Sequence, residues 1–295
     1  MSDGVTGSVA LSPAGGGRVR GTAAGLGFGE EDVAGLDELT RGQLLEARRT
    51  GEVGLVHSWE TVTAVDGPGT RLTFFLAGCP LRCLYCHNPD TFEMKEGTLE
   101  RADDLVGRIR RMRPVFRASG GGITLSGGEA LFQPAFATRL FREAHALGVH
   151  TCLDTSGFLG ARLSDADLAD IDLVLLDVKA GDEETYRRVT GQSLQPTIEF
   201  GDRLAALGKK VWVRFVLVPG LTDAEENVAA VADIAARWKD NVERVEVLPF
   251  HNMAIDKWDA LGLDYRLRDT RPPSRESVGR TVAAFEARGL TTFHG

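Results

Sequence analysis

The sequence has few cysteines, no long apolar run and no excess of basic charge. Its 295 residues include four cysteines, and no hydrophobic stretch approaches the roughly 18 residues of a membrane span. The amino-terminus lacks a charged segment followed by an apolar core, so we expect no signal peptide and a cytoplasmic protein without membrane contacts. With 42 acidic and 34 basic residues, the net charge of −8 argues against nucleic acid as a partner.

The few cysteines are crowded into one stretch, "GCPLRCLYCHNPD", residues 78–90. Cys79, Cys83 and Cys86 form a C-x3-C-x2-C pattern. Cytosolic thiols are kept reduced, so we do not expect a disulfide framework. Structural zinc sites and ordinary ferredoxin clusters usually take four protein ligands. Three thiols therefore either borrow a fourth ligand or leave one position of a metal cluster open.

The two ends of the chain differ in composition. Residues 1–30 are rich in Gly, Ala and Ser and nearly free of large apolar side chains, which predicts disorder. Leucines and a valine at roughly helical spacing predict a short helix within residues 31–49. We therefore expect an amino-terminal extension over residues 1–53 and one folded domain over residues 54–295.

Within that domain, short β-rich runs alternate with helical patterns, which indicates a parallel α/β sheet. Six such strands fit either an open doubly wound sheet or a barrel, complete or partial, of the TIM type. The expected strands are "TRLTFFLAG", "GGITLSGGE", "VHTCLDTSG", "IDLVLLDVK", "KVWVRFVLVPG" and "VERVEVLPFH". The expected helices cover residues 99–112, 134–148, 198–207, 224–238 and 275–287.

Polar residues cluster where the expected strands end. The cysteines follow the first strand, "SGGE" ends the second, Asp154 and Thr155 end the third, and Asp177 and Lys179 end the fourth. In parallel α/β folds the functional site lies at the carboxyl ends of the strands. This pattern predicts an active site at that rim of the sheet.

The cysteine motif, placed in a loop after the first strand, resembles the radical S-adenosylmethionine (SAM) superfamily. In that superfamily three thiolates hold a 4Fe-4S cluster, and the unique iron binds SAM, which is cleaved to methionine and a 5'-deoxyadenosyl radical. Tyr85 matches the aromatic residue that commonly precedes the last cysteine, and "SGGE" is similar to the glycine motif that binds the SAM amino group. The resemblance implies one cluster and SAM as cofactors.

The resemblance extends to a narrower family. The segments "VDGPGTRLTFFLAGCPLRCLYCHNPDT", "ASGGGITLSGGEALFQ", "HTCLDTSGF", "LVLLDVK", "VWVRFVLVPG" and "LPFHNMAIDKW" resemble the activating enzymes of pyruvate formate-lyase. That family, a partial (β/α)6 barrel, installs a glycyl radical in its partner and receives electrons from reduced flavodoxin or ferredoxin. Residues 88–120 contain no cysteine, which leaves no motif for a second cluster.

The resemblance assigns roles to matching residues. It places Cys79, Cys83 and Cys86 on the cluster, and Asp154, Thr155 and Asp177 around a monovalent cation. The expected cofactor-binding residues are Tyr85, Gly127, Gly128, Glu129, Asp154, Lys179 and His251. Each also has a structural alternative: Asp154 a helix or turn cap, Lys179 a simple ion pair with Asp177, and His251 a surface or core position.

Two further residues are expected to meet a partner peptide. Asp66, in "VDGPGTR", resembles the family residue that contacts the backbone of the partner's glycine loop, although a turn-forming role is an equal alternative. Arg214 lies within an apolar strand and is too costly to bury unpaired, so it faces the site or meets a carboxylate. Cys152 is expected to be a small inward-facing core residue.

Two other functions remain open on the sequence. A radical SAM enzyme of the deazaguanine synthase type would act on a small molecule without a protein partner. A zinc-binding interaction module would use His87 as a fourth ligand, although Cys86 and His87 are adjacent and can hardly both face one tetrahedral ion. Iron content after anaerobic purification distinguishes the zinc module from both radical enzymes.

Overall fold

A nine-stranded sheet forms the centre of the computed structural model, which describes residues 39–63 and 65–294. The strand order is β3-β1-β2-β4-β5-β6-β7-β8-β9. From β2 to β9 neighbouring strands are parallel, whereas β1 pairs antiparallel with β2 and with β3. The sheet thus has two separate edges, as in a partial barrel. The strands are β1 Val53–Thr63, β2 Arg71–Leu76, β3 Thr98–Arg101, β4 Gly122–Gly127, β5 His150–Thr155, β6 Leu173–Asp177, β7 Lys210–Leu217, β8 Val242–Pro249 and β9 Thr292–His294.

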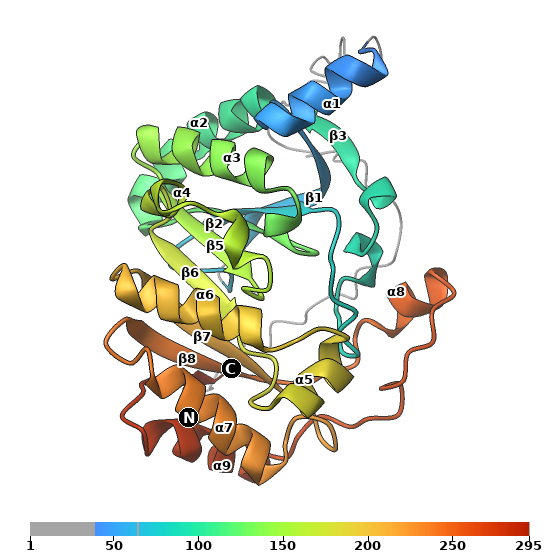
Figure 1. The fold of residues 1–295 in the computed structure, drawn as a ribbon, viewed down its shortest axis with the longest axis vertical. Coiled ribbons are helices and arrows are strands. Elements are labelled where there is room, and N and C mark those ends of the chain that lie inside the picture. The colour runs from blue at the N-terminus through green and yellow to red at the C-terminus, as the bar shows by residue number, and fades with distance from the viewer. Residues whose placement is uncertain (1–38, 64, 295) are drawn as a thin grey trace, which may run out of the picture.

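Helices cover the outer side of this curved sheet (Figure 1). Helices α2, α3, α6, α7 and α9 lie along that side, while α5 and α8 lie at the opposite, open side. The α/β partial barrel expected from the alternating pattern is confirmed, and β2 and β4 to β8 are its six expected strands. The helices are α1 Arg41–Thr50, α2 Ala102–Ser119, α3 Pro134–Ala146, α4 Asp165–Ala169, α5 Glu183–Thr190, α6 Gln195–Ala206, α7 Glu225–Ala236, α8 Ile255–Ala260 and α9 Arg275–Glu286.

The structure corrects one expected boundary and adds three strands. The helix predicted from Leu99 begins at Ala102, because residues 98–101 pair with β1 and Leu99 lies opposite Leu55. That helix also continues past Pro114 to Ser119, and the left-handed Gly120 ends it (φ 67°). Strands β3 and β9 lie at the two sheet edges, with β1 next to β3, and both edge strands are too short to show a periodic pattern.

The apolar core lies between the sheet and the outer helices, whereas the floor of the barrel is closed from inside. Cys152, Leu173, Leu175 and Trp212 form a small buried cluster on the inward side of the strands. Cys152 is fully buried there, which confirms its expected place in the core. Polar side chains are buried inside the barrel as well, among them Arg71 of β2 and Thr124 of β4, which lies beside Cys152 in the sheet register.

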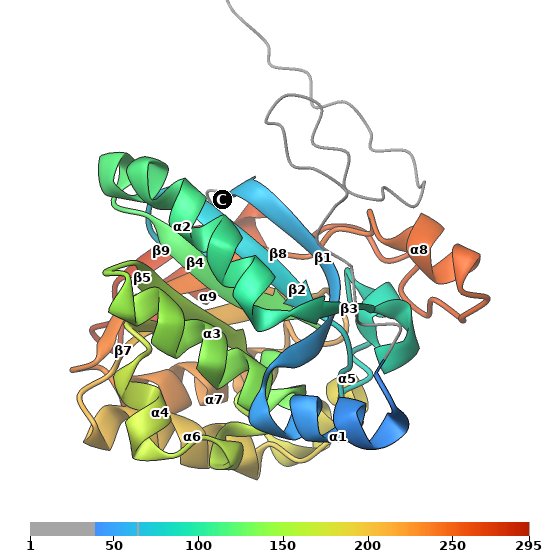
Figure 2. The ribbon, with the colours of Figure 1, turned by 90° about the horizontal axis from the view of Figure 1, so that it is seen from above.

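The amino-terminal part of the described chain is helical and packs on the domain. Thr40 and Gln43 form a capping box at the start of α1, and Ala47 is buried. Figure 2 shows α1 beside α3, with which it is in contact. Residues 1–30, for which the sequence predicts disorder, lie outside the described residues, and the domain boundary at residue 54 stays a prediction. Within residues 39–63 and 65–294, no helix is long and apolar enough to cross a membrane.

Candidate active site

The cysteine loop follows β2 and is held by backbone hydrogen bonds from both sides. The N–H groups of Arg82 and Leu84 donate to the last residues of α5, at 2.8 Å to Thr190 O and 2.9 Å to Val189 O. On the other side, Trp258 Nε1 of α8 donates to Cys86 O at 2.9 Å. The loop is therefore fixed between two helices at the open side of the barrel.

Of the three thiols of this loop, Cys83 is buried, whereas Cys79 and Cys86 are partly exposed to the cavity. Burial raises the pKa of Cys86 to about 12 and raises the pKa values of Cys79 and Cys83 above the ordinary thiol range. The thiols are therefore protonated in the ligand-free chain, and metal binding must release protons. In the described part of the chain, no group of three His, Cys, Asp or Glu side chains is already arranged around a metal position.

One cavity of about 710 Å³ contains every residue that the sequence assigned to the site. The volume lies in the range typical of small-molecule and cofactor pockets. The predicted residues lining it are Asp66, Cys79, Cys83, Tyr85, Cys86, Gly127, Gly128, Glu129, Asp154, Thr155, Asp177, Lys179, Arg214 and His251. The fold therefore brings together side chains from the β1–β2 loop, the cysteine loop and the ends of five further strands. Their individual roles stay predictions.

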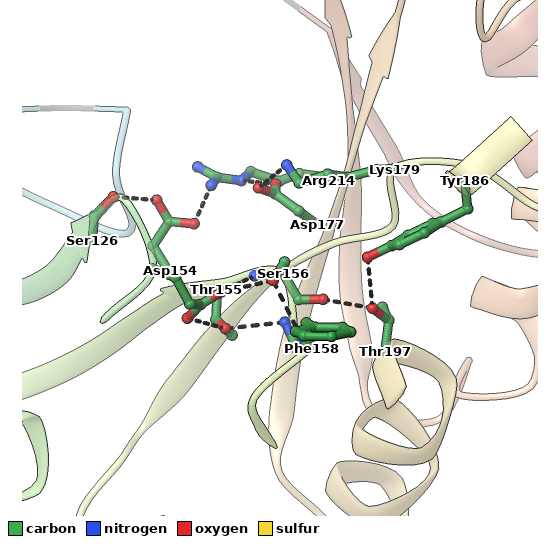
Figure 3. Close-up of polar contacts among 12 residues, drawn as sticks. Ser126, Asp154, Thr155, Ser156, Phe158, Asp177, Lys179, Tyr186, Thr197 and Arg214 are labelled. Atoms are coloured by element: carbon green, nitrogen blue, oxygen red, sulfur yellow. Dashed lines mark hydrogen bonds and ion pairs between the residues drawn. The ribbon is translucent and has the colours of Figure 1, made fainter. Parts of the chain in front are cut away.

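A row of charged side chains crosses the inner wall of the cavity (Figure 3). Arg214 on β7 contacts Asp154 of β5, and its Nε lies 3.0 Å from Oδ1 of Asp177 on β6. Lys179 Nζ lies 3.0 Å from the other oxygen of Asp177, and Ser126 Oγ donates to Asp154 at 2.6 Å. Two carboxylates thus alternate with two cations, so the buried charges nearly cancel.

The pKa values follow from this pairing. Burial alone raises the pKa of Asp177, but Arg214 and Lys179 lower it more, so it falls below its ordinary value. Burial likewise lowers the pKa of Lys179, yet Asp177 and the neighbouring Tyr85 and Cys83 raise it well above its ordinary value. Lys179 is therefore a permanent ammonium beside the cysteine loop, able to attract an anionic group.

Glu129 connects the glycine turn after β4 to the turn after β5. Its side chain is buried, and its Oε1 accepts a hydrogen bond from Thr155 Oγ1 at 2.7 Å. Its Oε2 accepts bonds from Ser156 N at 3.0 Å and Ser156 Oγ at 2.7 Å. Burial raises the pKa of Glu129, and the bonds from Ser156 and Thr155 oppose that shift. We call this set of bonds the Glu129 brace.

The glycine turn also approaches the cysteine loop closely. Gly127 has a φ of 118°, and a Cβ there would lie 2.2 Å from Leu76 N, so only glycine fits. Glu129 N donates to Gly78 O at 2.9 Å, directly before the first cysteine. The turn, the brace and the cysteine loop are therefore one connected structure.

Two aromatic residues occupy other walls of the cavity. Tyr85 is buried, its ring lies 5.7 Å from Lys179 Nζ, and within the described residues its hydroxyl has no hydrogen-bond partner. His251 stacks on His87 with ring centroids 4.2 Å apart, and His87 Nε2 lies 3.2 Å from His251 O. His87 thus contacts the histidine after β8. Within the described residues it is not grouped with the cysteines as a fourth metal ligand would be.

Known proteins show the same pattern of sequence. The model of the radical SAM superfamily matches residues 73–232. The pyruvate formate-lyase-activating enzyme of Clostridium pasteurianum is 43% identical over 224 residues, covering 76% of this chain and 93% of that one. The pyruvate formate-lyase 1-activating enzyme of Escherichia coli K12 is 40% identical over 239 residues, covering 80% and 97%. The chain belongs to the pyruvate formate-lyase-activating enzymes of the radical SAM superfamily.

The fold agrees with this membership. Streptococcus suis SuiB, in the crystal structure bound to precursor peptide SuiA, aligns with a TM-score of 0.59 at 14% identity. The alignment covers 86% of this chain and 52% of SuiB, and at this identity it supports the fold alone. As a pyruvate formate-lyase-activating enzyme, the chain is a radical SAM oxidoreductase, as the cysteine motif predicted.

The sequence did not assign roles to three residues that support the site of this activating enzyme. Ser126 and Ser156 bond the carboxylates of Asp154 and Glu129, and Trp258 holds the carbonyl of Cys86. Both serines occur inside motifs that the sequence offers, "SGGE" and "DTSG". Their position next to assigned residues was the available signal. Trp258 ends the segment "LPFHNMAIDKW", but its contact with Cys86, 172 residues away in sequence, could not be predicted.

Proposed function

We propose that the protein activates pyruvate formate-lyase, with a 4Fe-4S cluster and SAM as cofactors. When bound by the three cysteines, the cluster would supply the electron for reductive cleavage of SAM, and the resulting 5'-deoxyadenosyl radical would take a hydrogen atom from one glycine of the partner. The observation that carries the proposal is the shared cavity, which contains three thiols, a glycine turn and the row of charged side chains. The names of the relatives at 40% and 43% identity support the choice of partner.

The donor set fits an iron–sulfur cluster. Thiolates are the usual protein ligands of such clusters, and Cys79, Cys83 and Cys86 would hold three of four irons. Their loop is fixed by α5 and α8, so the backbone need not fold around the metal.

Several groups of the chain would hold SAM beside the cluster. The ammonium of Lys179 complements the SAM carboxylate, and the backbone of Gly127 and Gly128 would frame the methionine end. Asp154 would accept a hydrogen bond from the SAM amino group. Tyr85 and His251 line the cavity where the adenosine portion would extend.

The proposal includes a monovalent cation near Asp154 and Asp177. Arg214 already lies between these carboxylates, and the hydroxyl of Thr155 donates to Glu129. An added cation must therefore share both carboxylates with Arg214 and use Thr155 through its backbone carbonyl. Comparing SAM affinity in potassium, sodium and choline salts tests this part: equal affinities in all three would remove the cation.

The partner would enter from the open side of the barrel. Asp66 lines the cavity from the loop between β1 and β2, and its carboxylate can accept hydrogen bonds from a peptide backbone. Arg214, which lines the same cavity, would keep the cavity charge balanced as the peptide binds. We propose reduced flavodoxin or ferredoxin as the electron donor.

Product analysis tests the proposal against its alternatives. The anaerobically loaded protein is mixed with SAM and reductant, with and without pyruvate formate-lyase, and 5'-deoxyadenosine and the glycyl radical are measured. We expect a radical on the partner and deoxyadenosine in matching amount. Equal amounts of deoxyadenosine with and without pyruvate formate-lyase would favour a small-molecule substrate. A colourless protein that contains zinc would favour the interaction module.

A further inference from the structure

Arg71, the first residue of β2, is buried inside the barrel, and Asp66 and Asp172 act on it without forming an ion pair among the described residues. It is 0% exposed, and within residues 39–63 and 65–294 its guanidinium forms no ion pair. Burying an unpaired guanidinium costs free energy, which an apolar side chain of similar size would avoid. The groups that accept hydrogen bonds from this guanidinium should therefore explain why an arginine is buried here.

Within the described residues, the guanidinium donates only to neutral groups. Nε donates to Thr124 Oγ1 on β4 at 3.0 Å, and Nη2 donates to the carbonyl of Ile123. Nη1 lies 3.1 Å from His150 Nδ1, which must be the acceptor because arginine only donates. Arg71 therefore binds acceptors on two strands, β4 and β5, and its Nη1 also donates to Pro68 O of the preceding loop at 3.4 Å.

The bond to Thr124 decides how that hydroxyl is oriented. Thr124 Oγ1 also lies 2.6 Å from Asp66 O. Since Arg71 Nε can only donate, Thr124 accepts there, and its single proton is free to be donated to the Asp66 carbonyl. Arg71 thus fixes the backbone of Asp66 through one intervening hydroxyl.

A parallel chain of hydroxyls reaches the side chain of Asp66. Thr73 Oγ1 on β2 donates to Asp66 Oδ2 at 3.2 Å, and Thr63 Oγ1 on β1 lies 2.9 Å from Thr73 Oγ1. Because Thr73 gives its proton to the carboxylate, Thr63 must be the donor in the second bond. These contacts engage Oδ2, and within the described residues Oδ1 accepts no hydrogen bond, so it can accept one from a bound peptide.

The rest of the loop has little freedom to move. Gly67 has a φ of 125°, and a Cβ there would lie 3.3 Å from Arg71 Nε. Thr70 N donates to Ser119 Oγ at 3.2 Å, at the end of α2. Asp66 is therefore presented to the cavity by a loop that is fixed on both sides.

We propose that Arg71 is a positioning residue for partner docking: through Thr124 it holds Asp66 so that Oδ1 accepts a backbone N–H of the glycine-bearing peptide. This inference rests on the proposed function, because it takes that peptide as the ligand of Asp66. It differs from a purely structural role in one respect. Loss of the Thr124 hydroxyl should weaken docking and leave the cofactor site unchanged.

The test compares Thr124→Val, which removes the hydroxyl, with Thr124→Ser, which keeps it. We expect Thr124→Val to raise the Kd for pyruvate formate-lyase about five- to ten-fold, as for a lost hydrogen bond. Iron content, SAM affinity and kcat at saturating partner should match the wild type. Thr124→Ser should bind the partner with nearly wild-type affinity. Hydrogen exchange of residues 65–70, measured without partner, should be faster in Thr124→Val only.

A double-mutant cycle separates positioning from general destabilisation. In an Asp66→Ala background, Thr124→Val should cause no further loss of partner affinity, because the group it positions is gone. Additive losses, equal Kd values for wild type and Thr124→Val, or unchanged hydrogen exchange would each overturn the inference. Wild-type protein that fails to form a glycyl radical on pyruvate formate-lyase would instead count against the proposed function. The hydrogen-exchange comparison still decides whether Thr124 holds the loop.

Discussion

The guanidinium of Arg214 binds the carboxylate of Asp177 across two neighbouring strands, with Nε 3.0 Å from Oδ1. The same guanidinium contacts Asp154 on the next strand. All three side chains are at least four-fifths buried, so the cation is what allows two carboxylates to lie in one wall.

Replacing Arg214 should therefore be costly. We expect Arg214→Ala to lower the free energy of unfolding by about 3–5 kcal/mol, because it leaves buried carboxylates without their partner. Arg214→Lys, which keeps the charge but loses the second contact, should lose less. Urea unfolding of the variants measures both changes.

A surface arginine provides the matched control. Arg237 pairs with Asp202 at 2.6 Å, but both side chains are largely exposed. Arg237→Ala should change stability by about 0–1 kcal/mol. Equal losses of unfolding free energy in Arg214→Ala and Arg237→Ala would show that the buried ion pairs stabilise the fold no more than an exposed one.

The cluster assignment predicts the properties of a cysteine variant. The anaerobically purified wild type should be brown and contain about four irons. Cys83→Ser should lose iron and SAM cleavage together, because no other thiol of the loop can replace it. Cys152→Ser, in the barrel floor, should keep its iron; iron and cleavage in Cys83→Ser would refute the assignment.

The sequence was sufficient to predict which residues share the cavity. Carboxyl ends of parallel strands meet at one rim, so Asp154, Asp177 and Lys179 could be brought together from their positions alone. Their pairing could not be predicted in this way. Arg214 reaches both carboxylates only because β5, β6 and β7 are adjacent in the sheet, and strand order is not visible in one sequence.

Edge elements and braces were missed for a related reason. β3 has four residues and β9 three, so neither shows a pattern of its own, and both are stabilised by pairing with neighbours. Glu129 was assigned to SAM from its motif. Its carboxylate accepts hydrogen bonds from Thr155 and Ser156 because β4 and β5 are neighbours in the sheet, which one sequence does not reveal.

The Glu129 brace predicts a loss that an isosteric change should reveal. Each oxygen of Glu129 accepts from a backbone N–H, of Leu131 or Ser156, so in Glu129→Gln the amide N–H group faces a donor in either orientation. This should cost about 1–3 kcal/mol of unfolding free energy. SAM affinity should fall as well, because the brace supports the Gly127 turn. Glu143→Gln on exposed α3 surface should stay within about 0.5 kcal/mol of wild type, and an equally silent Glu129→Gln would contradict the brace.

Two truncations test the amino-terminal extension. Deleting residues 1–30 should leave iron content and SAM cleavage nearly unchanged, because that composition offers no core. Deleting residues 1–50 also removes α1, whose Ala47 is buried, and should lower the thermal midpoint. A large loss of activity from the shorter deletion would show that the segment contributes to the domain.

Asp66 is the residue whose loss should separate cofactor binding from partner modification. Asp66→Ala should keep its iron and bind SAM, yet fail to install the glycyl radical, because the peptide backbone loses its acceptor. Asp66→Asn keeps one carbonyl oxygen and should retain part of the activity. A full-strength radical signal from the Asp66→Ala mixture would remove this residue from the docking site.

The central claim is that this cavity installs a radical on a glycine of pyruvate formate-lyase. Electron paramagnetic resonance of pyruvate formate-lyase, mixed anaerobically with the loaded wild-type protein, SAM and a reductant, tests it most directly. The account predicts a stable glycyl radical signal that requires SAM and disappears with Cys83→Ser. No signal from a protein that contains its iron and cleaves SAM would contradict it.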